Sequence, residues 1–243
     1  MYETGTLVGV IGIIFTLLLS EPAMRLLRRR KEKQKRERWS ADLQVDEAQI
    51  RELKHYAYEY WRQVITVDDQ GNADHRVEAR IINIGDTQLD RVAFPVYCDA
   101  VNVPAAAVKP WANCGRALLP TSVEDWITER SRGRVAISIV PPLAPGERRK
   151  IRWGYTLPHT FIPGDEYYNW DIATPHYEVG GRIMFPETWT IQYARWDSDI
   201  ANTQPSPEVK GATIDWIVHF PERGKRFTMH FGLSKINIVA NNH

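Results

Sequence analysis

The feature that most restricts the fold of this chain is a period-two alternation of apolar and polar residues that begins after residue 56. Ala57, Trp61, Ile65 and Val67 alternate with more polar neighbours, which is typical of a β-strand with one buried face. Turn-forming residues interrupt the pattern at regular intervals. The same reasoning predicts further strands over residues 76–82, 89–97, 134–140, 148–155, 177–185, 188–196, 213–220 and 225–231. Short strands at this spacing predict a mainly β protein, an enlarged antiparallel β-sandwich that forms one domain over residues 57–243.

Few segments carry a helical pattern. Asp46-x-x-Gln49 is a capping-box pattern that predicts a helix through His55, and a short helix is expected over residues 123–130. Residues 201–211 contain two prolines and are expected to form a surface loop. No glycine-rich dinucleotide or phosphate-binding motif is present, which disfavours an α/β enzyme fold.

Two turn sequences connect the predicted strands to a known family. Asn83-Ile84-Gly85-Asp86 precedes the strand at 89–97, and Leu143-Ala144-Pro145-Gly146-Glu147 precedes the strand at 148–155. This pair resembles the N-x-G and L-x-P-G-E turns of bacterial immunoglobulin-like sandwich domains, over roughly residues 57–157. The resemblance implies a sandwich and no particular activity, because such folds host many functions.

Residues 1–27 have the composition of a membrane anchor. Thr4–Ser20 is uncharged and would reach about 25 Å as a helix, against about 30 Å for the hydrocarbon core of a bilayer. Apolar residues up to Leu27 lengthen this stretch if Glu21 reaches the interface. We therefore expect one transmembrane helix over residues 1–27, followed by a basic juxtamembrane and linker helix over residues 28–56.

The order of charges predicts which side of the membrane the β-domain occupies. No Lys or Arg precedes the apolar stretch, which argues against a cleaved signal peptide. Nine Lys and Arg residues follow it, between residues 25 and 38, and such residues stay on the cytoplasmic side. We expect an inner or plasma membrane protein with its N-terminus outside and its C-terminal domain in the cytoplasm. An interfacial helix on the cytoplasmic face is the alternative.

The charge distribution also bears on partners. Residues 1–38 carry a net charge of +5, from nine basic and four acidic residues, and the remainder carries −4, from 22 basic and 26 acidic residues. The β-domain therefore has no overall attraction for nucleic acid. Gly5-x-x-x-Gly9 would let two spans pack closely as a homo-oligomer. The basic run is either a topology signal in a solvated linker or a site for anionic lipid headgroups, with the candidate residues Arg28, Arg29, Arg30, Lys31 and Lys33.

An aromatic segment between residues 153 and 177 is the main candidate for a binding site. Its rings, carboxylates and amide could stack a sugar, a nucleobase or a peptide and fix its orientation. The alternative is that the rings fill the core of the sandwich. The candidate ligand-binding residues are Trp153, Tyr155, Asp165, Tyr167, Tyr168, Trp170 and Arg182.

Catalytic and metal chemistry have weaker support. Asp165, Glu166 and Asp171 are carboxylates that could serve glycoside hydrolysis, but loop carboxylates are usually solvated, so we assign no catalytic residue and expect no enzyme. His219 and His230 would face each other across a hairpin at residues 224–225. A third ligand is not evident, so we expect neither a metal nor a cofactor.

These expectations combine into one functional hypothesis. The chain is predicted to be a single-pass membrane protein whose cytosolic β-sandwich binds a partner protein or a small ligand, as a sensor, effector or scaffold. The first alternative is an envelope-exposed domain that binds carbohydrate or protein, which an oxidised Cys98–Cys114 pair would favour. The second alternative is a glycoside-type hydrolase that uses the loop carboxylates.

Overall fold

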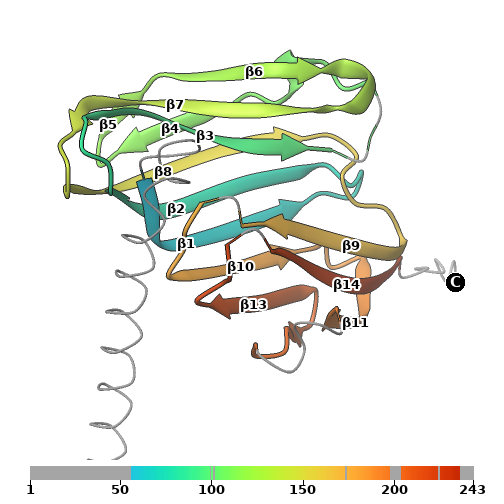
Figure 1. The fold of residues 1–243 in the computed structure, drawn as a ribbon. Coiled ribbons are helices and arrows are strands. Elements are labelled where there is room, and N and C mark those ends of the chain that lie inside the picture. The colour runs from blue at the N-terminus through green and yellow to red at the C-terminus, as the bar shows by residue number, and fades with distance from the viewer. Residues whose placement is uncertain are drawn as a thin grey trace, which may run out of the picture. The chain divides into compact units, whose positions relative to one another are not determined.

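The computed structural model describes residues 56–98, 100, 102–172, 174–197, 204–223 and 225–235 (Figure 1). All of these residues belong to one compact unit. No helix among them is long and apolar enough to span a bilayer. The predicted anchor over 1–27, the lipid-binding candidates and nearly all of the predicted linker helix over 28–56 lie outside the described residues.

The described residues are mainly β, as predicted, with two short 3₁₀ turns, η1 (Ala105–Ala107) and η2 (Thr128–Arg130). The strands are β1 (Tyr56–Val67), β2 (Ala73–Asn83), β3 (Leu89–Tyr97), β4 (Trp111–Cys114), β5 (Ala117–Leu119), β6 (Thr121–Ile127), β7 (Arg132–Leu143), β8 (Arg148–Leu157), β9 (Gly164–Asp171), β10 (Glu178–Met184), β11 (Trp189–Trp196), β12 (Glu208–Lys210), β13 (Thr213–His219) and β14 (Arg226–Lys235).

Two local predictions were wrong. The helix expected over residues 123–130 is strand β6 followed by the turn η2, because Val123 pairs with Val135 of β7 and the β-branched and aromatic residues of this segment suit a sheet. The loop expected over residues 201–211 contains the short strand β12, which pairs with β13 and forms an edge of the large sheet.

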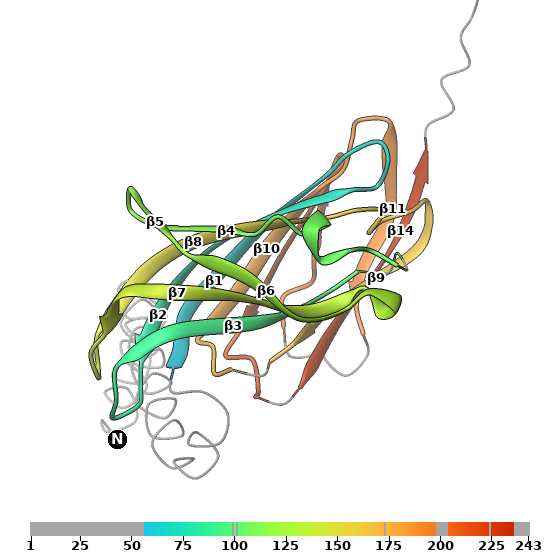
Figure 2. The same cartoon turned by 90° about the horizontal axis from the view of Figure 1, so that it is seen from above.

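The strands form three sheets. One sheet has the order β12-β13-β10-β1-β2-β8-β4-β5, and two three-stranded sheets have the orders β3-β7-β6 and β11-β14-β9. Figure 2 shows the green β3-β7-β6 group and the orange-to-red β9, β14 and β11 as separate groups. The layered β arrangement implied by the immunoglobulin-like resemblance is confirmed. The eight-stranded sheet differs from the antiparallel sandwich that we expected, because β1 pairs in parallel with β10.

Aromatic rings pack both small sheets against the large one. The ring of Phe94 in β3 lies 5.4 Å from Trp153 in β8, and Trp170 in β9 lies 5.1 Å from Trp61 in β1. Trp153 is fully buried. Because such rings bury large apolar areas and favour edge-to-face contacts, they hold the two layers together around one core.

A bulge in β1 decides which of its residues face that core. The register against β2 shifts between Tyr58 and Tyr60, so one residue of β1 has no counterpart and the side-chain phase changes. Tyr58 is consequently buried, although the alternation predicted it on the more polar side.

The two turns that carry the family resemblance contact each other directly. The buried Asn83 side chain donates through Nδ2 to the carbonyls of Leu143, at 2.9 Å, and Thr87, at 2.7 Å. The Gly146 backbone N–H donates to the Asn83 carbonyl at 2.8 Å. The first turn therefore secures the second, which fixes the position of β7 and β8 relative to β2 and β3.

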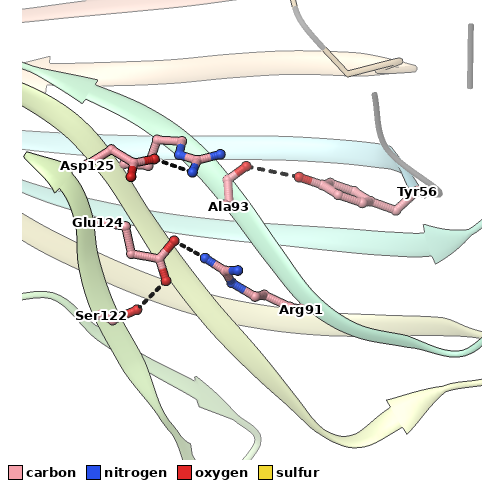
Figure 3. A network of polar contacts seen from close by, with 7 residues as sticks. Tyr56, Arg91, Ala93, Ser122, Glu124 and Asp125 are labelled. Carbon is pink, nitrogen blue, oxygen red and sulfur yellow. Dashed lines mark hydrogen bonds and ion pairs between the residues drawn. The ribbon is translucent and has the colours of Figure 1, made fainter. Parts of the chain in front are cut away.

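Polar contacts tie β3 to its neighbours (Figure 3). Arg91 of β3 pairs with Glu124 of β6, which also accepts from the Ser122 hydroxyl at 2.9 Å. The Tyr56 hydroxyl donates to the Ala93 carbonyl of β3 at 3.0 Å. The exposed ion pair adds little stability, whereas the Tyr56 bond joins the first described residue of β1 to the opposite sheet.

Candidate ligand-binding site

A cavity of about 140 Å³ lies where the two small sheets meet over the large sheet. Strands β3 and β9 contribute its rim, and each of them pairs with a strand on one side only, β3 with β7 and β9 with β14. Strands β1, β2 and β8 of the large sheet contribute its floor. The cavity therefore occupies the seam between two sheet edges, which backbone pairing leaves open.

The cavity is lined mostly by rings. Its aromatic and imidazole side chains come from five strands and from the segments before and after β9, and they are Tyr58, Trp61, His75, Phe94, Tyr97, Tyr155, Phe161, Tyr167, Tyr168, Trp170 and His176. A flat apolar group can stack on such walls, since aromatic pairs favour offset and edge-to-face contacts. Among the described lining residues no side chain is a carboxylate.

A short hydrogen-bonded chain gives the lining its polar character. The Tyr168 hydroxyl donates to Gln63 Oε1 at 2.8 Å, so the Gln63 amide nitrogen faces His75 Nδ1, also at 2.8 Å. Because the amide nitrogen is a donor, Nδ1 of His75 is the acceptor and its proton resides on Nε2. Burial lowers the pKa of His75 from 6.5 to about 3, so the ring is neutral near pH 7.

Among the buried ring nitrogens of the cavity lining are N–H donors that have no hydrogen-bond partner among the described residues. Nε2 of His75 and Nε1 of Trp61 are both inaccessible and make no hydrogen bond within the described part of the chain. The His75 ring is held in place by Tyr155, which stacks on it at 4.5 Å with an angle of 12°. Unsatisfied buried polar atoms are uncommon in folded proteins, and here both are N–H donors in residues that line one cavity.

A larger groove of about 620 Å³ adjoins the cavity. Five residues from β3 and β9 line both spaces: Pro95, Val96, Tyr97, Tyr167 and Asn169. The groove itself adds three arginines, Arg132, Arg134 and Arg226, and one carboxylate, Asp125. Its charged side chains are thus predominantly basic, although the part of the chain after residue 38 is acidic overall.

Four of the predicted site residues come together at the cavity. Tyr155 on β8 and Tyr167, Tyr168 and Trp170 on β9 all line it. Trp153 instead lies in the core, fully buried between the two layers. The core interpretation of the aromatic segment therefore holds for Trp153, and four of the other candidates share one cavity.

Two other predicted site residues point elsewhere. Asp165 accepts a hydrogen bond from the Tyr193 hydroxyl at 2.8 Å, and Arg182 forms a two-pronged ion pair with Asp215 at 2.6 and 2.9 Å. Neither lines the cavity. Glu166 accepts from the Ile162 backbone N–H at 2.9 Å, so these carboxylates secure local structure.

Sequence reasoning missed Gln63 and His75. Both occupy positions of the buried phase in their strands, where each is flanked two residues away by apolar side chains such as Ile65 and Val77. A polar residue at a strand position where the alternation predicts a buried apolar residue is the signal that would have identified them, because a buried polar residue needs hydrogen-bond partners in the core.

The predicted His219–His230 pair does not form. β13 pairs with β10 and β12, whereas β14 pairs with β9 and β11, so the two histidines belong to different sheets. His219 instead lies opposite Glu178, with 3.8 Å between Nδ1 and the carboxylate. The described residues contain no cluster of three or more potential metal ligands, and no disulfide joins Cys98 and Cys114.

Comparison with known proteins gives no family assignment. No protein-family model and no curated protein matches the sequence. Among solved structures, yeast LTA4 hydrolase in complex with bestatin is similar at a TM-score of 0.44 and 6% identity, over 74% of this chain and 29% of that one. An M1 zinc metallopeptidase from Deinococcus radiodurans is similar at a TM-score of 0.41 and 11% identity, over 73% of this chain and 42% of that one. The chain spans less than half the length of either, and similarity at this level assigns no activity.

Proposed function

We propose that this chain is a membrane-anchored, non-enzymatic binding protein whose β-domain takes up a small planar ligand in the cavity between β3 and β9. The observation that carries the proposal is a ring-lined cavity with unsatisfied buried N–H donors on His75 and Trp61. A planar ligand with acceptor atoms at its edge would stack on the rings and accept from these donors after a small shift of the side chains.

The chemistry of the lining supports binding over catalysis. The cavity lining contains two histidines, His75 and His176. A pKa of about 3 makes His75 a poor proton acceptor near pH 7, and Nδ1 of His176 is hydrogen-bonded to the Thr174 carbonyl. The hydroxyls of Tyr155 and Tyr168 stay protonated, because burial raises the pKa of both. Neutral, hydrogen-bonding groups of this kind suit recognition.

The position of Tyr56 supports a sensor role. Tyr56 begins β1, directly after the predicted juxtamembrane segment, and its hydroxyl bonds to the Ala93 carbonyl, which belongs to the cavity lining. An occupant of the cavity would act on β3 and, through this bond, on the start of β1. In our proposal that strand leads to a membrane span and a lipid-contacting basic segment on the cytoplasmic side.

The proposal is tested with ring-sized probes. Saturation-transfer NMR on the full chain in detergent micelles should show binding of purine or benzamide. Val96→Phe adds a ring at a buried lining position and should abolish the signal. The matched control Val209→Phe, on the partly exposed β12, should retain it.

A second, milder variant tests the site in case Val96→Phe loses binding because it does not fold. Tyr168→Phe removes only the hydroxyl that donates to Gln63, so the fold should persist while probe affinity falls several-fold. If neither probe binds the parent chain, or if Val96→Phe and Val209→Phe give equal signals, the cavity is not a ligand site.

A further inference from the structure

We infer that the ligand is a nucleotide, with its base in the ring-lined cavity and its phosphate in the adjoining arginine groove. This inference rests on the proposed function and adds the chemical class of the ligand. The joint observation behind it is that a cavity for one flat ring system shares five lining residues with a groove that three arginines line.

The size of the inner cavity selects a single ring system. Its volume of about 140 Å³ is close to that of an engineered cavity of about 150 Å³ that takes up benzene in another protein. An oligosaccharide does not fit such a space. A nucleobase can enter between the aromatic rings of the cavity, with its sugar directed toward the adjoining groove.

The polar groups of the cavity match the edge of a base. Gln63 and Asn169 carry side-chain amides, and both residues line the cavity. The Gln63 amide bonds to Tyr168 and His75. Asn169 Oδ1 accepts from the Thr228 hydroxyl, so each amide has an N–H that these bonds do not use. The N–H of His75 Nε2 and that of Trp61 Nε1 need acceptors, and ring nitrogens and carbonyl oxygens of nucleobases are acceptors. Apolar rings with a few convergent polar groups are the usual makeup of such sites.

The residues that line both the cavity and the groove offer surfaces for the sugar. Tyr97 on β3 and Tyr167 on β9 line both spaces and are 42% and 53% exposed. An exposed tyrosine on each side gives a ribose apolar contact and a hydroxyl for hydrogen bonding. These two tyrosines could therefore hold the sugar of a ligand whose base lies in the cavity and whose phosphate lies in the groove.

The groove has the charge that a phosphate requires. Arg132 lies opposite Tyr97 and Arg134 opposite Pro95 in the β3–β7 pairing, and Arg226 is the first residue of β14. Arg134 pairs with Asp125, whereas Arg132 forms no ion pair with any described residue. Guanidinium groups form bidentate hydrogen bonds with phosphate oxygens, so the groove favours a dianionic phosphate over a neutral ligand.

The test compares each nucleotide with its nucleoside. Isothermal titration of the full chain in detergent micelles uses AMP, GMP, CMP and UMP, the 3′,5′-cyclic forms of AMP and GMP, the four nucleosides, and inorganic phosphate. At least one nucleotide should bind ten-fold or more tightly than its nucleoside. This ratio should shrink in high salt, because exposed charges are screened.

Arginine variants locate the phosphate. The double variant Arg132→Gln/Arg226→Gln should bring the nucleotide-to-nucleoside ratio close to one while nucleoside affinity stays unchanged. Arg195→Gln, at an exposed arginine of β11 that contacts Tyr193, is the matched control and should leave the ratio intact.

The outcomes separate this inference from the proposed function. If purine or nucleosides bind but no phosphate improves affinity, the nucleotide assignment fails and the cavity remains a ligand site. If nucleotides bind but the Arg132/Arg226 variant keeps the full ratio, or if inorganic phosphate binds as tightly as any nucleotide, the assignment also fails. If neither the ring-sized probes, purine and benzamide, nor the nucleotides bind, both proposals are contradicted.

Discussion

At the scale of single residues, His75 shows how the core accommodates a polar group. It occupies a buried position of β2, accepts a hydrogen bond from Gln63 at 2.8 Å and stacks on Tyr155. Because protonation would place a charge in the core, burial lowers its pKa to about 3. The lowered pKa is thus a property of the folded state, and it returns to the ordinary value on unfolding.

This difference predicts a pH-dependent stability. Between pH 6.5, the usual pKa of histidine, and about pH 3 the unfolded chain binds one more proton at His75 than the folded chain does, so stability falls as the pH falls. From pH 7 to pH 5 the loss from this residue should be about 2 kcal/mol. Urea unfolding of the parent and of His75→Phe at both pH values measures it.

The variant keeps a flat ring against Tyr155 but cannot titrate. His75→Phe should be less stable than the parent at pH 7, because the Gln63 amide loses its acceptor, yet its stability should fall less between pH 7 and pH 5. Equal slopes for the two proteins would show that His75 does not titrate on unfolding.

At the scale of elements, the contact between two turns positions four strands. Asn83 ends β2 and bonds to the turn between β7 and β8, through Leu143 and Gly146. Asn83 Oδ1 also accepts from the Gly85 backbone N–H at 3.0 Å. One side chain therefore closes its own turn and secures the neighbouring one.

Removing this side chain should destabilise the domain considerably. Asn83→Ala eliminates three hydrogen bonds at a fully buried position and leaves carbonyls unsatisfied, so the free energy of unfolding should drop by about 3 kcal/mol. Asp86→Ala, at an exposed position of the same turn, should change it by less than about 0.5 kcal/mol. Urea unfolding of both variants decides; a small effect of Asn83→Ala would mean that the turns dock without it.

Element prediction succeeded where alternation was regular and failed at β9. The strand at 89–97 has the predicted bounds, and β8 and β11 lie close to theirs. In β9 the sequence Gly-Asp-Glu-Tyr-Tyr-Asn-Trp-Asp mixes carboxylates and rings, so no clear period emerges. Pairing with β14, in which Tyr168 lies opposite Met229, holds this segment extended. Such pairing between distant segments cannot be predicted from the local sequence.

At the scale of the whole molecule, the order of charges before the β-domain governs its predicted placement. The basic residues between 25 and 38 follow the uncharged stretch Thr4–Ser20. If that stretch spans a bilayer, the positive-inside rule keeps the β-domain in the cytoplasm. The ligand would then be a cytoplasmic solute.

Reporter fusions at His243 test this placement. A reporter that is active only in the cytoplasm should be active, and one that is active only outside the membrane should be silent. Replacing Arg28, Arg29, Arg30 and Lys31 by Gln should raise the share of the outside reporter, because the basic flank sets orientation. An active outside reporter on the parent chain contradicts the placement.

The sequence alone determined that the part of the chain described by the structure is mainly β, because alternation and turn residues act over a few positions and can be recognised within a short segment. It also indicated the two turns that meet through Asn83 and four of the rings at the cavity, those of Tyr155, Tyr167, Tyr168 and Trp170. Only the tertiary structure decided that Gln63 and His75 join Tyr155 and Tyr168, that Arg132 and Arg226 line the adjoining groove, and that the strands sort into three sheets. These arrangements depend on which strands pair across the chain and where β1 is bulged, and many pairings are compatible with one local pattern until the core is packed.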